Sequence, residues 1–207
     1  MTDPRTQLVA ETYDAIADRF ADWRDEIVGD PRSSWLEALA SRLSDGDPVL
    51  ELGCGAGEKD TRSLAERFDV TGVDISAEQV ARARANAPAA HFIQGDFTVI
   101  DFPAATFAAV ASFYAFNHVP RELLRNLFAK IHSWLVPGGY FLASLGAADT
   151  PEWTGEWLGA TTFFSSYPAD VNRRLLAEAG FELELDEVVT FREPEGDVQF
   201  HWILGRT

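Results

Sequence analysis

Residues Val49–Gly57, with the sequence VLELGCGAG, join a short apolar run to a turn that has glycine at alternate positions. A short apolar run bounded by turn residues predicts a buried strand. The glycines Gly53, Gly55 and Gly57 predict a turn whose backbone closely approaches a neighbour. A glycine-rich turn after a first strand is the place where open α/β sheets bind nucleotide-like ligands, although a purely structural strand-to-helix turn is the alternative.

The residues beside the glycines favour a ligand with an ammonium group over a diphosphate. The dinucleotide fingerprint places its third glycine three residues after the second, and here that position is Glu58. A carboxylate there would repel a diphosphate. Glu51 lies two residues before Gly53, where a carboxylate can hold an ammonium group directly or through water. The pattern therefore indicates a nucleoside joined to an amino acid.

Three further segments follow in order along the chain. The apolar stretch 70–76 contains Asp74, which lies 17 residues after Gly57 and ends a predicted second strand. A carboxylate at the end of such a strand can accept hydrogen bonds from both ribose hydroxyls. The other two segments are Gly95-Asp96-Phe97 and the turn Leu135-Val136-Pro137-Gly138-Gly139.

Over residues 49–145 these segments resemble the ordered motifs of class I S-adenosylmethionine-dependent methyltransferases, in particular small-molecule enzymes of the type 11 and type 25 groups. The resemblance implies an α/β, Rossmann-like, doubly wound sheet of seven strands in the order 3-2-1-4-5-7-6, with strand 7 antiparallel. It implies S-adenosyl-L-methionine as the cofactor. We expect a single domain over 1–207, with an N-terminal helical cover at 1–45 and a lid insertion at 146–167.

The same resemblance implies the roles of the cofactor-binding residues. The three glycines would cradle the methionine moiety, Asp74 would bind ribose, and Asp96 with Phe97 would bind adenine. Residues 13–20 resemble the family pattern Y-D-x-x-A-x-x-Y with Phe in the last place. The complete expected set is Tyr13, Glu51, Gly53, Cys54, Gly55, Gly57, Asp74, Ile75, Asp96, Phe97 and Phe113.

Cys54 is the only cysteine in the chain. Its place between two glycines favours a small side chain in a tight turn, because no base lies beside it in the sequence to activate a nucleophilic thiol.

The segment 146–167 is rich in aromatic and acidic residues and follows the predicted fifth strand. Because α/β ligand sites lie at the carboxyl ends of strands, we interpret it as a substrate wall or lid; a hydrophobic cluster covering the sheet edge is the alternative. The expected substrate-binding residues are Phe20, Asn117, Trp153, Trp157, Phe164 and Tyr167, with Asp149 and Glu156 as weaker candidates.

His118 is the candidate catalytic base, because it follows the predicted fourth strand and an imidazole titrates near neutral pH. It could instead orient the loop before Pro120. His201 lies within a predicted strand and is expected to be structural. The four histidines form no metal-binding spacing, so no metal site is expected.

The charge balance narrows the class of partner. With 17 basic and 33 acidic residues, the formal net charge of −16 would repel nucleic acids and anionic membranes. A small-molecule acceptor is the better partner. The sequence shows neither a long apolar span nor a signal peptide, which favours a cytoplasmic location. Oligomeric state is open between monomer and homodimer.

The motifs, the family resemblance and the charge balance together predict methyl transfer to a small organic acceptor. An O-methyltransferase of specialised metabolism is the first candidate, and C- or N-methylation is the next. A non-catalytic methyltransferase-like partner subunit is a further alternative. An NAD(P)-dependent oxidoreductase is disfavoured by Glu58 and by Pro137-Gly138-Gly139.

Hydrophobic periodicity and turn residues predict the remaining elements. We expect helices at 8–28, 34–43, 59–68, 76–87, 121–135 and 168–179, and strands at 91–93, 107–114 and 139–145. A C-terminal hairpin is expected from strands 181–190 and 198–204, joined by a long polar loop at 192–197.

Overall fold

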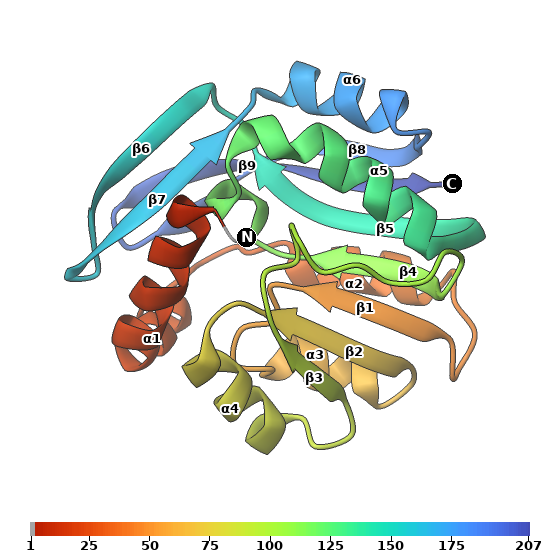
Figure 1. The fold of residues 1–207 in the computed structure, drawn as a ribbon, viewed down its shortest axis with the longest axis horizontal. Coiled ribbons are helices and arrows are strands. Elements are labelled where there is room, and N and C mark those ends of the chain that lie inside the picture. The colour runs from red at the N-terminus through yellow and green to blue at the C-terminus, as the bar shows by residue number, and fades with distance from the viewer. Residues whose placement is uncertain (1–2) are drawn as a thin grey trace.

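The computed structural model describes residues 3–207, which form a central seven-stranded sheet in the order β3-β2-β1-β4-β5-β9-β8 (Figure 1). The pairs among β1 to β5 are parallel, and β9 runs antiparallel to both β5 and β8. Because β6 and β7 belong to a separate sheet, β8 and β9 are the sixth and seventh strands of the central sheet, and the predicted order 3-2-1-4-5-7-6 is confirmed. The strands are β1 (Pro48–Leu52), β2 (Asp69–Asp74), β3 (His91–Gln94), β4 (Phe107–Ser112), β5 (Leu135–Gly146), β8 (Glu182–Glu193) and β9 (Gly196–Arg206).

Alternating residues of β1 divide the core into two layers, because successive side chains of a strand point to opposite faces of the sheet. Leu50 packs in the layer covered by α5 and α6, and Val49 packs in the layer covered by α2 and α3. The helices are α1 (Pro4–Asp25), α2 (Arg32–Ala40), α3 (Lys59–Ala65), α4 (Ala77–Asn86), α5 (Leu124–Trp134) and α6 (Ala169–Glu178). No helix within residues 3–207 combines the length and the apolar composition needed to cross a bilayer.

The first helix begins earlier and ends earlier than the predicted 8–28. The Asp3 side chain accepts a hydrogen bond from the backbone amide of Arg5, and Pro4 occupies the first turn, so this pair caps the helix ahead of its apolar stripe. After Asp25 the chain leaves the helix, and Val28 pairs with Arg192 in an isolated antiparallel bridge. The end of α1 is thus attached to the C-terminal hairpin.

The predicted long polar loop in that hairpin is wrong. The strands pair up to Glu193 and Gly196, which leaves Pro194 and Glu195 as the turn. Polar residues in this stretch belong to exposed strand ends, where pattern alone cannot separate a strand from a loop. As a result, the hairpin is long enough to reach the end of α1.

Residues that follow β5 form a second sheet, for which the sequence pattern of 146–167 predicted no strands. Strand β6 (Thr150–Trp157) pairs antiparallel with β7 (Ala160–Ser166) around a turn at Leu158 and Gly159. Figure 1 shows this hairpin and α1 on the side of the molecule to which the parallel strands point with their carboxyl ends. Both segments therefore stand beside the glycine turn.

We expect Gly57→Ala to destabilise the protein more than Gly46→Ala. Both glycines have left-handed backbones, with φ of +60° and +85°, so either change should cost about 1–2 kcal/mol in backbone energy. A Cβ at Gly57 would lie 2.8 Å from the Cβ of Ala83 in α4, whereas one at Gly46 would meet nothing within 4 Å. Overpacking should cost the Gly57 variant roughly another 1–3 kcal/mol in urea unfolding. Equal losses in the two variants would show that the contact with α4 is not tight.

Candidate functional site

A cavity of about 420 Å³ lies at the carboxyl ends of β1, β2 and β4, beneath α1 and the β6–β7 hairpin. Its size is that of a small-molecule site. The sequence-predicted residues that line it are Tyr13, Phe20, Glu51, Gly53, Cys54, Gly55, Asp74, Ile75, Asp96, Phe97, Phe113, Asn117, His118, Trp157 and Phe164.

Three other expected site residues lie outside this lining. Gly57 packs against α4, and Trp153 is 42% exposed on β6, where its ring packs on Phe164. Tyr167 lies beneath the guanidinium of Arg121, 4.6 Å from the ring centroid.

The weaker candidates are also outside the cavity lining. Asp149 forms an ion pair with Arg121, and Glu156 is exposed. The buried His201 places its Nε2 2.9 Å from an Asp186 carboxylate oxygen on the neighbouring strand β8, consistent with a structural histidine.

The glycine turn is held against the end of β2 by backbone and carboxylate hydrogen bonds. The amide of Gly53 donates to the carbonyl of Val73 over 2.8 Å. The two carboxylate oxygens of Asp74 accept from the amides of Gly55 and Ser76, at 2.8 and 2.9 Å. Because the carboxylate is buried, its pKa is raised above the usual range. Asp74 is therefore a fixed acceptor at the cavity wall.

Gly53 also approaches the loop after β4. A Cβ at Gly53 would lie 2.4 Å from the Cβ of Ala115, so a larger residue there would displace this loop.

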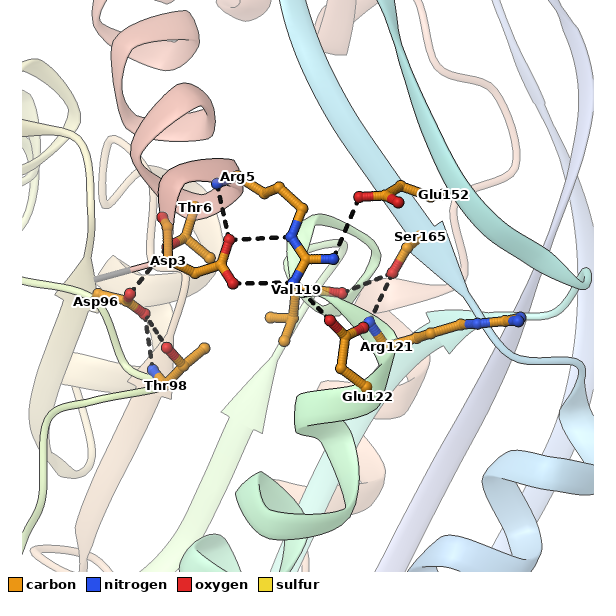
Figure 2. Close-up of polar contacts among 10 residues, drawn as sticks. All are labelled: Asp3, Arg5, Thr6, Asp96, Thr98, Val119, Arg121, Glu122, Glu152 and Ser165. Atoms are coloured by element: carbon orange, nitrogen blue, oxygen red, sulfur yellow. Dashed lines mark hydrogen bonds and ion pairs between the residues drawn. The ribbon is translucent and has the colours of Figure 1, made fainter. Parts of the chain in front are cut away.

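Asp96 lines the cavity beside the first turn of α1 (Figure 2). One carboxylate oxygen accepts from the amide and the hydroxyl of Thr98, at 2.9 and 2.7 Å. The other lies 3.1 Å from the Thr6 hydroxyl, which also lies 2.8 Å from the carbonyl of Asp3. The single hydroxyl proton can satisfy only one of these two acceptors at a time. The second oxygen of Asp96 consequently keeps capacity to accept from a ligand.

Arg5 joins the start of α1 to the segments around it. Its guanidinium contacts Asp3, Glu122 in the short turn Arg121–Leu123, and Glu152 in β6, at 2.9, 2.5 and 3.2 Å (Figure 2). These ion pairs are partly exposed, so each contributes little stability alone, but together they tie α1 and the β6–β7 hairpin over the cavity. No sequence pattern relates the positions of these residues.

Two buried charged side chains at the cavity each have an atom without a partner among residues 3–207, and Oδ1 of Asn117 in the same lining is also unpaired. Glu51 is 4% exposed and its Oε2 accepts no hydrogen bond. The side chain of Arg32 donates to Asp60 and Asp30 at 2.7 and 3.2 Å, but its Nε has no acceptor. Burial raises the pKa of Glu51 to about 7. Unpaired buried groups of opposite sign are expected where a ligand completes the network.

His118 is held in a defined tautomer. Its Nδ1 lies 2.9 Å from the carbonyl oxygen of Phe163 in β7, and a carbonyl can only accept, so Nδ1 carries the proton. Nε2 is then an acceptor and receives a hydrogen bond from the Tyr13 hydroxyl over 2.9 Å. Burial lowers the pKa of His118 to about 4. The ring is therefore neutral near pH 7, with its basic nitrogen beside Tyr13 at the cavity.

An aromatic wall closes the outer side of the cavity. Ring centroids of Tyr13 and Phe20 are 5.0 Å apart, those of Trp23 and Trp157 are 5.3 Å apart, and Phe164 lies 5.8 Å from Trp157. The first three rings come from α1 and the last two from the β6–β7 hairpin.

Several lining residues were missed by the sequence analysis. They come from the end of α1, from the segment around α2, from the loop after β4 and from the C-terminal hairpin, and none belongs to a motif. The main ones are Trp23, Arg24, Arg32, Tyr114, Glu193 and Phe200.

Comparison with known proteins gives the family. Residues 49–139 match the family described as "Methyltransferase domain". The chain is 32% identical over 164 residues to the 27-O-demethylrifamycin SV methyltransferase of Amycolatopsis mediterranei (strain S699), which covers 67% of this chain and 58% of that protein. The chain spans about half the length of the curated relatives it matches.

Two solved structures share the fold along most of this chain. One is the 1,6-didemethyltoxoflavin-N1-methyltransferase of Burkholderia thailandensis with bound S-adenosylhomocysteine, at TM-score 0.64 and 20% identity, covering 96% of this chain and 90% of that one. The other is the (4+2)-cyclase SpnF, at TM-score 0.75 and 18% identity, covering 100% and 98%. These two structures show the fold, and the family match together with the sequence relative places this chain in the class I S-adenosylmethionine-dependent methyltransferase family.

Proposed function

We propose that the protein transfers a methyl group from S-adenosyl-L-methionine to a small organic acceptor, first of all to a hydroxyl oxygen, as an enzyme of specialised metabolism. The observation that carries the proposal is the continuity of one cavity from the acidic residues beside the glycine turn to the basic Nε2 of His118. The rifamycin-derivative enzyme, to which the chain is similar, is named for an O-methylation.

The residues present fit the cofactor at both of its polar ends. The fixed carboxylate of Asp74 would accept from the ribose hydroxyls, and the free capacity of Asp96 would accept from the adenine amino group. At the other end, the unpaired Oε2 of Glu51 would hold the ammonium group. The unpaired Nε of Arg32 would donate to the carboxylate group. Each orphaned atom thereby gains a partner of opposite charge.

When bound, the cofactor supplies a methyl group on a sulfonium centre, which is already activated. The protein has therefore mainly to orient the acceptor and exclude water, and the aromatic wall of α1 and the hairpin does both. We propose that the acceptor hydroxyl takes the position of the Tyr13 hydroxyl at Nε2 of His118, which would accept its proton as the bond from the acceptor oxygen to the methyl carbon forms and the bond from that carbon to sulfur breaks. The Phe163 carbonyl stabilises the resulting imidazolium through Nδ1.

C- and N-methylation are the alternatives that stand next to this proposal. An amine acceptor with a free lone pair would need no base in the cavity, whereas a hydroxyl needs one. The defined tautomer of His118 therefore favours a hydroxyl over an unprotonated amine as the acceptor.

Asp74→Asn should weaken the binding of S-adenosylhomocysteine while Asp69→Asn should not. Both acids belong to β2, but Asp69 is exposed at the far end of the strand. Loss of hydrogen bonds to a charged group should raise the Kd by about 10- to 150-fold, or roughly 1.5–3 kcal/mol, in titration calorimetry. Equal affinity of the two variants would refute the ribose role of Asp74.

The affinity for S-adenosylhomocysteine should decrease as the pH is lowered, because the Glu51 carboxylate becomes protonated. Its carboxyl, with a pKa of about 7, must be ionised to hold an ammonium group, so its contribution is complete above pH 7 and is lost as the pH falls below it. From pH 8 to 6 the Kd should rise about tenfold. Glu51→Gln should bind more weakly at pH 8 and show a flat profile. Glu193→Gln, which removes another carboxyl with a raised pKa, should keep the dependence of the Kd on pH. A flat profile in the Glu193 variant and not in the Glu51 variant would assign the pH dependence to Glu193.

His118→Asn should lower turnover by about 10²- to 10⁴-fold while cofactor affinity changes little, because a base contributes to the chemical step alone. His132→Asn is the matched control, since His132 lies on α5 and packs on Phe181 away from the cavity. Turnover would be measured with an identified acceptor after thermal melts show that both variants fold. Normal turnover of the His118 variant would leave this residue with a structural role in the loop.

A further inference from the structure

The tip of the β8–β9 hairpin brings an acidic side chain to the acceptor part of the cavity. Glu193 is the last residue of β8, lines the cavity and is partly buried. Within residues 3–207 its carboxylate takes part in no hydrogen bond and no ion pair. A partly buried carboxylate that lines a cavity and has no partner in the protein is available to bind a ligand.

Glu193 is held in place by contacts on both sides of it. Arg192 exchanges two backbone hydrogen bonds with Val28, at 3.0 and 3.1 Å. The indole nitrogen of Trp23 donates to the Glu195 carboxylate, whose oxygens lie 3.0 and 2.9 Å away. These anchors attach the tip to the end of α1, so the position of the Glu193 carboxylate at the cavity is set by the fold.

The charges around Glu193 are of the same sign. Burial, together with Glu195 and Asp30, raises the pKa of Glu193 to about 7. The nearby cations form their ion pairs with other acids, Arg32 with Asp30 and Asp60, and Arg24 with Glu58 at 3.3 Å, and neither pairs with Glu193. An anionic ligand would be repelled by the Glu193 carboxylate, and a neutral ligand could offer it a hydrogen bond but no opposite charge. A cation would satisfy it.

The walls of the cavity also favour a cation. Tyr13, Trp23 and Trp157 line it from α1 and the β6–β7 hairpin, and Tyr114 and Phe200 line it from the side of β9, with ring centroids 4.8 Å apart. The faces of aromatic rings attract ammonium groups, and the attraction grows as water is excluded. An acidic group among aromatic rings is the usual chemistry of an amine-binding pocket.

Resting on the proposed function, we propose that the acceptor carries a basic nitrogen, protonated at neutral pH, which the Glu193 carboxylate binds among these rings while a hydroxyl of the same molecule faces His118. The acceptor class is thus an amino alcohol or an aminophenol. Glu193 determines which molecules bind, and His118 determines which oxygen is methylated.

The test compares three phenols that share a two-carbon side chain and differ in the group at its end. Tyramine is cationic, 4-ethylphenol is neutral and 3-(4-hydroxyphenyl)propionate is anionic at pH 7.5. Each is titrated into the protein saturated with S-adenosylhomocysteine, and binding is followed by calorimetry and by tryptophan fluorescence. We expect tyramine to bind at least about tenfold more tightly than 4-ethylphenol, and the propionate to bind most weakly.

Glu193→Gln should reduce this preference to within about threefold, because the amide keeps the shape and loses the charge. Glu187→Gln, the same change at an exposed position of the same strand, should keep the full preference. Equal binding of the three phenols to the unmodified protein, no binding of any of them, or an undiminished preference in the Glu193 variant would overturn the inference. Failure of S-adenosylhomocysteine itself to bind would instead overturn the proposed function.

Discussion

The hydrogen bonds from the Gly55 and Ser76 amides to the Asp74 carboxylate are the interaction on which the site depends. They join the turn after β1 to the turn after β2, and the same carboxylate remains at the cavity wall. Ser76 in turn caps α4 by accepting from the amide of Gln79. One buried acid therefore fixes the cofactor-facing backbone, the start of a helix and a ligand-binding group together. Its desolvation, which raises its pKa, is offset by these bonds.

A second layer of the site is built on this frame by segments that lie far apart in the chain. His118 follows β4, yet its tautomer depends on the Phe163 carbonyl of β7 and its basic nitrogen on the Tyr13 hydroxyl of α1. Arg5 fastens the same helix and the β6–β7 hairpin with ion pairs (Figure 2). The chemistry proposed for His118 thus requires that α1 and the hairpin stay together over the cavity.

The unpaired polar atoms at the cavity indicate which ligand groups it can bind. Glu51 and Arg32 leave one acceptor and one donor, which suit an amino acid moiety, and Glu193 adds a carboxylate at the cavity wall. Groups buried in this way cost stability in the free protein, and a ligand of the right charge recovers that cost on binding. The excess of acids over bases in the chain is consistent with this preference for cations.

The sequence by itself determined the strand and glycine turn at residues 49–57, because apolar runs and glycine spacing are local patterns, whereas the sheet order followed from the resemblance of its ordered motifs to a known family. It also placed most of the expected residues at one cavity, from Glu51 to Phe164, since strand ends of a parallel sheet must meet at one edge. Only the tertiary structure decided that residues 150–166 form a hairpin, that the turn at Pro194 is tight, and that Glu193 reaches the cavity. Pairing of strands and approach of side chains across the chain depend on long-range packing, which no local pattern encodes.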